Sequence, residues 1–519
     1  MDNLKALNYL QTLPLPHHNQ NSLHMKIRRP FLLLLLTAFL SFQACKNTAE
    51  KAPVTEAPAT PAFEKPRVPD WHKDATIYEV NLRQYSQEGT FKSFEKELPR
   101  LKAMNVDILW FMPIQPISKK NSKGSLGSPY AVADYKATNP DYGTLEDFKH
   151  LVDAIHTAGM HVIIDWVPNH TGWDNKWITE HKDWYTLDSL GNVVDPIDPS
   201  TGKSWGWTDV ADLNYDNPQM RLGMIDAMKF WVNETGIDGF RCDVAHNVPA
   251  DFWAQCADSL YAIKPLFMLA EAEVPAIRNN GTFVADYGWA MHSLFNDIAA
   301  TQGVNKVAAA KLVQGNKVDG KAAAPVHKTA LDIDVLLAQK AAENQQGYSM
   351  QFTSNHDENS WAGTEFARYG AGHKAFAVLA ATFDGMPLLY TGMESAMDRQ
   401  LQFFEKDPVT WGDYKYAGFY TTLFDLKHKN KALWNGDAGG KLVKIPTGND
   451  ENIYAFIREK DGDKVVVVVN LSAKPQDATL KGSNFAGTYK DVFTQKNMEL
   501  KDGQVLKMKA WEYWVWSNK

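Results

Sequence analysis

Four apolar segments of this chain end in an acidic residue, and this feature restricts the fold more than any other. The acids are Asp165, Asp243, Glu271 and Asp357. A carboxylate that is removed from water destabilises the folded protein by several kcal/mol unless a partner offsets this penalty. Four such acids at the ends of apolar segments therefore indicate a site with a function. In a closed parallel barrel the C-terminal strand ends meet at one rim, where such carboxylates converge. The pattern therefore predicts a barrel with an acidic site at that rim.

Strand-like and helix-like segments alternate over residues 70–435, which is typical of a parallel sheet. Eight strands with intervening helices fit an α/β fold of the (β/α)8 or TIM barrel type, and a single helix is expected over 94–104. The expected strands are 77–82, 106–111, 161–165, 236–243, 265–271, one within 283–300, 349–357 and 386–390.

Two regions depart from this alternation. Residues 171–212, after the third strand, form a long insertion that contains five tryptophans, which are expected mainly to pack a small subdomain and otherwise to stack on sugars. Residues 436–519 contain strand-like segments bounded by Gly, Asp and Lys turns, and they predict a C-terminal antiparallel β-sandwich domain.

The N-terminal 69 residues are not expected to join the barrel. Residues 1–24 form an upstream extension, and a basic segment followed by the apolar run 31–42 has the layout of a secretory signal. A small residue before Cys45 resembles a bacterial lipoprotein processing site, so Cys45 is the predicted lipidation site; cleavage near Ala44 without a lipid is the alternative. Residues 46–69, rich in Pro, Ala, Thr, Glu and Lys, predict a disordered tether. We therefore expect an exported protein anchored by lipid in the bacterial cell envelope.

Composition excludes several classes of partner. The formal charge is −7, and residues 1–45 carry one acidic and four basic side chains, so the remainder has a formal charge of −10. An acidic surface argues against nucleic acid and favours a neutral substrate. Beyond Cys45 the chain has only Cys242 and Cys256, so no disulfide framework is expected.

The acids permit a specific chemistry. Arg241 lies two residues before Asp243, so both occupy one face of a strand, either as a structural ion pair or as a guanidinium that keeps a reactive carboxylate ionised. Cleavage of a glycosidic bond with retention needs two carboxyl groups about 5–5.5 Å apart. Metal binding is the rival use of an acidic cluster, but a two-metal hydrolase usually has more histidine ligands.

Four motifs in a fixed order identify the family that the chain resembles. They are Asp165–His170, Gly239–Asp243, Ala270–Glu271 and Asn355–Asp357, each at the end of its expected strand. Together they resemble the α-amylase superfamily, glycoside hydrolase family thirteen, over nearly the whole chain after the tether. The family fold, a barrel with an insertion after the third strand and a C-terminal β-domain, agrees with the pattern described above.

The resemblance implies a role for each matching residue. Asp243 is implied to be the nucleophile, and Glu271 the general acid and then base, with a pKa raised by the neighbouring carboxylates. Asp357 is implied to hold ring hydroxyls of the sugar before the scissile bond. The remaining implied substrate contacts are His170 and His356, which hydrogen-bond that sugar, Arg241, which orients the nucleophile, and Tyr130, which forms the stacking platform.

The chain departs from the family pattern in places. His246 stands one position early relative to the Lys-His pair that many members carry after the nucleophile. Asn169 and Asp212 resemble calcium ligands of true α-amylases, so a structural calcium is a candidate, although the chemistry requires no cofactor. Barrel sequence begins directly after the tether, without the N-terminal domain that forms dimers in cyclomaltodextrinases and neopullulanases, so a monomer is expected.

The predicted function is retaining hydrolysis of α-1,4-glucosidic bonds in starch-derived glucans and maltooligosaccharides. A glucanotransferase shares every catalytic residue, and cyclomaltodextrinase or neopullulanase activity is a further alternative. A non-catalytic glycan-binding relative is the alternative from another class; such relatives typically lack one of the three acids, and all three are present here.

Overall fold

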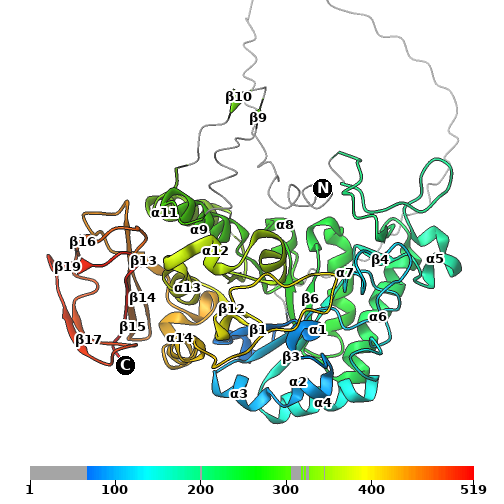
Figure 1. Cartoon of the computed structure of the whole chain (residues 1–519), viewed down its shortest axis with the longest axis horizontal. Helices are drawn as coiled ribbons and strands as arrows, with labels where there is room; N and C mark the ends of the chain where they lie inside the picture. The colour runs from blue at the N-terminus through cyan, green and yellow to red at the C-terminus, as the bar shows by residue number, and fades with distance from the viewer. Residues whose placement is uncertain (1–66, 199–200, 306–316, 319–320, 323–326, 344) are drawn as a thin grey trace, which may run out of the picture. The chain divides into compact units, whose positions relative to one another are not determined.

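The barrel expected from the sequence is present. The computed structural model describes residues 67–519 except 199–200, 306–316, 319–320, 323–326 and 344. Within this described part, eight parallel strands close into a barrel in the order β1-β12-β11-β8-β7-β6-β3-β2 (Figure 1). The strands are β1 (Ile77–Val80), β2 (Ile108–Phe111), β3 (His161–Trp166), β6 (Gly239–Cys242), β7 (Phe267–Ala270), β8 (Ala285–Tyr287), β11 (Tyr348–Gln351) and β12 (Met386–Tyr390).

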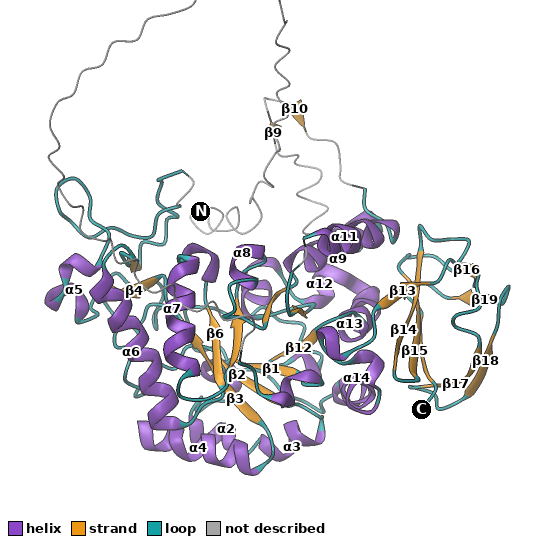
Figure 2. Cartoon of the chain, turned by 180° about the vertical axis from the view of Figure 1, so that it is seen from behind, coloured by secondary structure: helices purple, strands orange, loops and turns teal. Residues whose placement is uncertain are grey.

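Helices cover the outside of the barrel (Figure 2). Their apolar faces pack on the strands, and each fully buried large apolar side chain contributes about 1.5–3 kcal/mol. The helices are α1 (Leu82–Tyr85), α2 (Phe91–Glu95), α3 (Leu98–Ala103), α4 (Leu145–Thr157), α6 (Pro218–Thr235), α7 (Ala250–Tyr261), α8 (Pro275–Arg278), α9 (Trp289–Thr301), α11 (Leu331–Ala342), α12 (Glu365–Tyr369), α13 (His373–Thr382) and α14 (Ala417–Lys429).

Helix α6 shows how local sequence sets the frame of the site. Asn217 caps its N-terminus by accepting from the backbone N–H groups of Gln219 and Met220, and Pro218 occupies the first turn, where its missing N–H costs nothing. Gly236 ends the helix in the left-handed conformation, with φ of 73°. The chain then turns directly into β6, which carries the catalytic motif.

The single helix expected over 94–104 is wrong. The structure divides it into α2 and α3, with Glu97 at the N-cap of α3 and Pro99 in the first turn of that helix. Proline lacks an N–H donor and clashes with the preceding turn of a continuous helix, so it is tolerated only where a helix begins.

The insertion is a small subdomain attached to the barrel by a two-stranded sheet. Strand β4 (His170–Gly172) pairs antiparallel with β5 (Val210–Asp212), and α5 (Trp177–Glu180) lies between them in sequence. Outside these elements, β9 (Lys317–Val318) and β10 (Lys321–Ala322) form another two-stranded sheet.

The C-terminal segment forms the expected antiparallel β-domain. A six-stranded sheet has the order β13-β14-β15-β20-β17-β18, and β16 pairs with β19. The strands are β13 (Leu442–Lys444), β14 (Ile453–Lys460), β15 (Asp463–Asn470), β16 (Gln476–Thr479), β17 (Gly487–Asp491), β18 (Asn497–Leu500), β19 (Val505–Met508) and β20 (Tyr513–Ser517).

Arg458 of β14 joins this domain to the barrel. Its buried guanidinium donates to the carbonyl oxygens of Thr382 and Phe383, at the end of α13, and to that of Gly440. Burial lowers the pKa of Arg458, while the carboxylate of Asp384 raises it. Because removing this side chain would leave several buried carbonyl groups without a donor, the two domains are held together by polar as well as apolar contacts.

The predictions for the N-terminus lie outside the described residues. This applies to the extension 1–24, the signal segment, Cys45 and nearly all of the tether 46–69. No helix in the described part of the chain is long and apolar enough to cross a bilayer. Cys242 and Cys256 are buried free cysteines.

Candidate active site

Arg241 is the centre of a buried carboxylate cluster at the C-terminal ends of β3, β6 and β7. The barrel register places it beside Asp165, and its Nη1 donates to Asp165 Oδ1 at 2.8 Å and to Asp243 Oδ1 at 2.9 Å. Its Nη2 lies 2.9 Å from Glu271 Oε2, as an ion pair rather than a well-aligned hydrogen bond. Asp243 and Glu271 therefore lie on one rim, separated by little more than a single guanidinium.

Val244 follows Asp243 in an unusual conformation. Its φ is 43°, in the left-handed region that β-branched residues rarely adopt. This conformation directs the Val244 N–H to Glu271 Oε2, at 2.8 Å. Because Arg241 approaches the same oxygen, a proton on Glu271 belongs on Oε1. The sequence did not reveal this contact, since a backbone donor carries no residue signature.

His356 connects the acids of the site to the aromatic residues. Its Nδ1 is hydrogen-bonded to Glu79, and its Nε2 lies 2.8 Å from Tyr130 Oη and 3.3 Å from Asp357 Oδ2. Burial lowers its pKa, but the charges of Asp357 and Glu79 outweigh that effect and raise the pKa to about 9. At neutral pH His356 is therefore an imidazolium that donates from both ring nitrogens.

The pKa of Glu271 differs from the sequence-based expectation. Burial raises it, but Arg241 and the Val244 N–H stabilise the carboxylate more, and the net pKa lies below the ordinary value. Burial also raises the pKa of Asp243 well above its ordinary value, although Arg241 lowers it, and the pKa of Asp357 rises to about 6, mainly through burial. The expectation of a raised pKa at Glu271 is thus wrong for the free protein, because it neglected the cation and the backbone donor.

Tyr130 forms an aromatic surface beside the acids. Its ring stacks on that of His356 at 5.3 Å between centroids and lies 6.2 Å from the half-buried Phe403. Its hydroxyl donates to Asp165 Oδ2 at 3.0 Å. Asp165 is fully buried and also accepts from Arg241. It therefore balances the charge of Arg241 and orients Tyr130, and it is not accessible to a substrate.

Three further residues support this arrangement and were not predicted. Glu79 of β1 pairs with His356, Tyr287 of β8 accepts from Arg241 Nε at 3.0 Å, and Trp110 of β2 donates from Nε1 to Asp165 at 3.2 Å. All three lie in strands that the sequence located, but only the closure of the barrel shows which strand faces point inward.

His170 lies at the junction between the barrel and the insertion. It is 4% exposed, and burial lowers its pKa to about 4, so it is neutral at physiological pH. Its ring contacts that of Trp207 edge to face, at 5.8 Å between centroids. The structure thus places all seven predicted catalytic and substrate-binding residues at one end of the barrel, with His170 at the edge nearest the insertion.

His246, which departs from the family pattern, lies at the edge of the site. The side chain is exposed, and its Nδ1 lies 3.3 Å from the backbone oxygen of Glu271. It therefore stands beside the acid and not among the groups that surround Arg241.

The candidate calcium ligands form an incomplete donor set. Strand pairing sets Asp212 opposite His170, and Asn169 Nδ2 lies 3.2 Å from His170 Nδ1. Burial raises the pKa of Asp212 to about 7, and no group of three His, Cys, Asp or Glu side chains suited to a metal occurs in the described ranges. Calcium takes 6–8 oxygen ligands, which these two residues do not supply. Asn169 and Asp212 by themselves therefore do not make up a calcium site.

The geometry defines a class of enzyme. Two carboxyl groups meet one guanidinium on the rim of a (β/α)8 barrel, a third acid is adjacent, and an aromatic surface lies beside them. A pair of carboxyl groups in one pocket is the equipment for hydrolysing glycosidic bonds. The site is that of a glycosidase.

Comparison with known proteins identifies the family. Residues 69–435 match the family described as alpha amylase, catalytic domain, and residues 444–515 match the maltogenic amylase C-terminal domain. The chain therefore belongs to the α-amylase family of glycoside hydrolases and is a glycosidase.

Individual relatives share the fold at low identity. Alpha-amylase MalA of Haloarcula japonica is 26% identical over 78% of this chain, which spans 57% of that protein's length. Alpha-amylase 3 of Dictyoglomus thermophilum is 26% identical over 78% of this chain and 85% of its own. The crystal structure of a noncanonic maltogenic alpha-amylase from Thermotoga neapolitana is similar with a TM-score of 0.71 and 26% identity, covering 86% of this chain and 98% of that one.

Proposed function

We propose that this glycosidase hydrolyses α-1,4-glucosidic bonds of starch-derived glucans and maltooligosaccharides with retention of configuration. The observation that carries the proposal is the contact of both Asp243 and Glu271 with the single guanidinium of Arg241. The relatives named alpha-amylase and maltogenic alpha-amylase support the substrate class.

The residues suggest how the reaction proceeds. Asp243 attacks the anomeric carbon and forms a glycosyl ester while Glu271 Oε1–H protonates the departing glycosidic oxygen. Glu271 then takes a proton from a water molecule that attacks the ester, and Asp243 is released. In the free protein the pKa of Glu271 lies below its ordinary value, so bound substrate must stabilise the proton on Glu271 Oε1 before this residue can act as the acid.

His356 and Asp357 have a different part in the reaction from that of Asp243 and Glu271. The imidazolium of His356 and the carboxyl of Asp357 are 3.3 Å apart and lie beside Tyr130. We propose that they bind hydroxyl groups of the sugar whose bond is cleaved. Hydrogen bonds that strengthen as the ring flattens toward the oxocarbenium geometry lower the barrier.

A second activity is favoured by specific similarities. Neopullulanase 2 of Thermoactinomyces vulgaris is 24% identical over 84% of this chain, and the C-terminal domain matches that of maltogenic amylases. Cyclomaltodextrinase, neopullulanase or glucanotransferase activity would use the same carboxyl groups. These activities differ in the glucan accepted and in whether water or a sugar hydroxyl attacks the ester.

A substrate panel tests the proposal. Purified protein is incubated with starch, pullulan, a cyclodextrin and maltotriose, and the products are identified by chromatography. Release of maltooligosaccharides or maltose from starch supports α-1,4 hydrolysis. Products longer than maltotriose from maltotriose would show transfer, and no turnover of any of these glucans would reject the proposal.

Replacing the acid should affect substrates according to their leaving groups. We expect Glu271→Gln to lower kcat on maltooligosaccharides by about 10²–10⁴-fold, because a general acid contributes that much. Formation of the glycosyl ester from α-maltosyl fluoride should fall far less, since fluoride departs without protonation. Pre-steady-state rates with both substrates measure the difference, and equal losses on both would contradict this role.

We also propose that Cys45 carries a lipid that anchors the exported enzyme in the bacterial envelope. Cys45→Ala should then move the enzyme from the membrane fraction to the soluble fraction. Fractionation followed by mass spectrometry of the N-terminal peptide is the measurement. Unchanged fractionation together with an unmodified natural Cys45 would reject the anchor and leave ordinary cleavage near Ala44 as the explanation.

A further inference from the structure

The backbone changes its conformation directly after Asp357. Strand β11 ends at Gln351, and the chain then runs through Asp357 into a π-helical turn over Glu358–Ala362. Such turns are rare and are frequently found at functional sites. Because this turn begins at the residue after the acid, the contacts that fix Glu358 also bear on the position of Asp357.

Two buried side chains bind the carboxylate of Glu358. His292 of α9 places its Nε2 2.9 Å from Glu358 Oε2, and Arg368 of α12 places its Nη1 3.5 Å from the same oxygen. The side chains of His292, Arg368 and Glu358 are only 3%, 2% and 13% exposed. A carboxylate so far removed from water needs partners of this kind, and removing one of them is destabilising.

The same two side chains also bind the backbone on the other side of Asp357. His292 Nδ1 lies 3.2 Å from the carbonyl oxygen of Phe352, and this nitrogen donates, because a carbonyl only accepts. Arg368 Nη2 donates to the carbonyl oxygen of Thr353 at 2.6 Å. His292 and Arg368 therefore connect the chain before Asp357 to the residue after it.

The turn is held from two directions. Helices α9 and α12, which carry His292 and Arg368, pack against each other on the outside of the barrel (Figure 1). Asn359, the second residue of the turn, donates to the Arg399 carbonyl at 3.1 Å and accepts from the Leu401 N–H at 2.8 Å. Two helices thus hold the turn through Glu358, and a separate loop holds it through Asn359.

We propose that Glu358 is a positioning residue for the reaction: held by His292 and Arg368, it aligns Asp357 with the hydroxyl groups of the sugar ring. The inference rests on the proposed function, because it takes Asp357 to bind the sugar whose bond is cleaved. Rates are sensitive to such alignment, and a misplacement of about 1 Å can lower a rate by about 10²-fold. A purely structural ion pair would change stability and leave the rate of the folded enzyme unchanged.

Steady-state kinetics on maltoheptaose test the inference. We expect Glu358→Ala to lower kcat and kcat/KM by the same factor, about 10–100-fold, with KM changed less than about threefold. Glu358→Gln keeps an oxygen that accepts from His292 or Arg368 but loses the charge, so its kcat should fall by only about fivefold. Circular dichroism and the melting temperature show that each variant is folded at the assay temperature.

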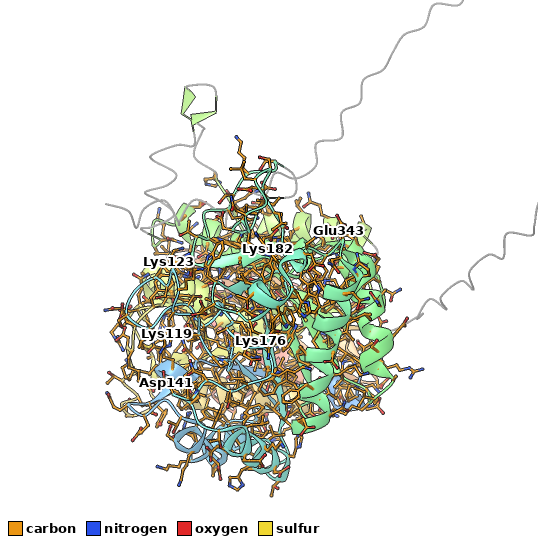
Figure 3. The ribbon with its side chains drawn as sticks, turned by 90° about the vertical axis from the view of Figure 1, so that its right-hand side faces the viewer. Lys119, Lys123, Asp141, Lys176, Lys182 and Glu343 are labelled. Atoms are coloured by element: carbon orange, nitrogen blue, oxygen red, sulfur yellow. The ribbon has the colours of Figure 1, made fainter. Side chains whose placement is uncertain are left out.

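Asp107→Ala is the matched control for a loss of stability. Asp107 Oδ2 lies 2.7 Å from His428 Nε2, so it is also a carboxylate paired with a histidine, but it precedes β2 at the N-terminal end of the barrel. This variant should lower the melting temperature and leave kcat unchanged. Lys176→Met removes the exposed partner of Asp134 on the face that Figure 3 shows, where Lys176 is labelled, and it should change neither quantity.

The outcomes separate this inference from the proposed function. An unchanged kcat in Glu358→Ala, a loss confined to KM, or an equal loss of kcat in Asp107→Ala would overturn the positioning role and leave the glucan activity intact. If Glu358→Ala does not fold, Glu358→Gln decides: a kcat equal to that of the natural protein would overturn the role, and the expected loss would support it. Failure of the natural protein to turn over any glucan would overturn the proposed function and the positioning role together.

Discussion

Asp243→Asn is expected to fold like the natural chain and to lose at least about 10³-fold in kcat, which corresponds to about 4 kcal/mol of barrier. An amide cannot form the glycosyl ester, so the chemical step is lost. The fold should survive because the amide oxygen still accepts from Arg241 Nη1, which lies 2.9 Å from Asp243 Oδ1.

Steady-state kinetics on maltoheptaose measure the loss, and circular dichroism with thermal unfolding checks the fold. Binding of maltoheptaose by the variant separates lost chemistry from lost affinity. Residual turnover above about one tenth of the natural rate would remove Asp243 as the nucleophile.

Arg241→Met should cause the largest loss of stability of any single change in the site. It leaves Asp165, Asp243 and Glu271 without their shared cation in a fully buried position. Removing one partner of a buried ion pair costs about 3–5 kcal/mol, because the remaining charges keep their desolvation penalty. The midpoint of urea unfolding should therefore fall clearly, and activity should disappear with it.

The pH dependence of this loss identifies its cause. Arg241 lowers the folded-state pKa values of Asp165, Asp243 and Glu271, so all three rise when it is removed, that of Glu271 from below its ordinary value. The folded variant then binds more protons than the unfolded chain. The stability deficit should therefore grow between pH 5 and pH 8 and shrink as the pH falls. Lys429→Met, which removes an exposed partner of Asp425, is the matched control and should change stability little at any pH. A deficit independent of pH would show that lost packing, not charge, is the cause.

The order of the motifs was sufficient to locate the acids. Asp243 and Glu271 directly follow the buried strands β6 and β7, and Asp357 lies in the segment after β11, which ends at Gln351. The parallel strands of the barrel send every C-terminal end to one rim. For the same reason Arg241 could be paired with Asp243, since residues two apart on a strand share a face. The boundaries of helices were less predictable. The amphipathic pattern over 94–104 favours one helix, but Pro99 is tolerated only in the first turn of a helix, so α2 and α3 are separate.

The electrostatics of the site could not be predicted in this way. Like charges near Glu271 suggested a raised pKa, yet the structure adds Arg241 and the Val244 N–H to the same carboxylate. Arg241 and the Val244 N–H lower the pKa of Glu271 through charge and hydrogen bonding over about 3 Å. Such short distances arise only when the folded barrel places the strands side by side. The contact of Trp207 with His170 could likewise not be predicted, because packing between residues far apart in the chain is a tertiary property.

The sequence by itself therefore determined the barrel, the β-domain and the identity of the acids, because strand period and residue type are local properties of a chain. Tertiary structure alone decided that Arg241 and the Val244 N–H stabilise the Glu271 carboxylate, that Asp165 is fully buried, and that Trp207 contacts His170. Charge compensation and exposure are sums over neighbours that are far apart in the chain, and only the closed fold brings those neighbours together.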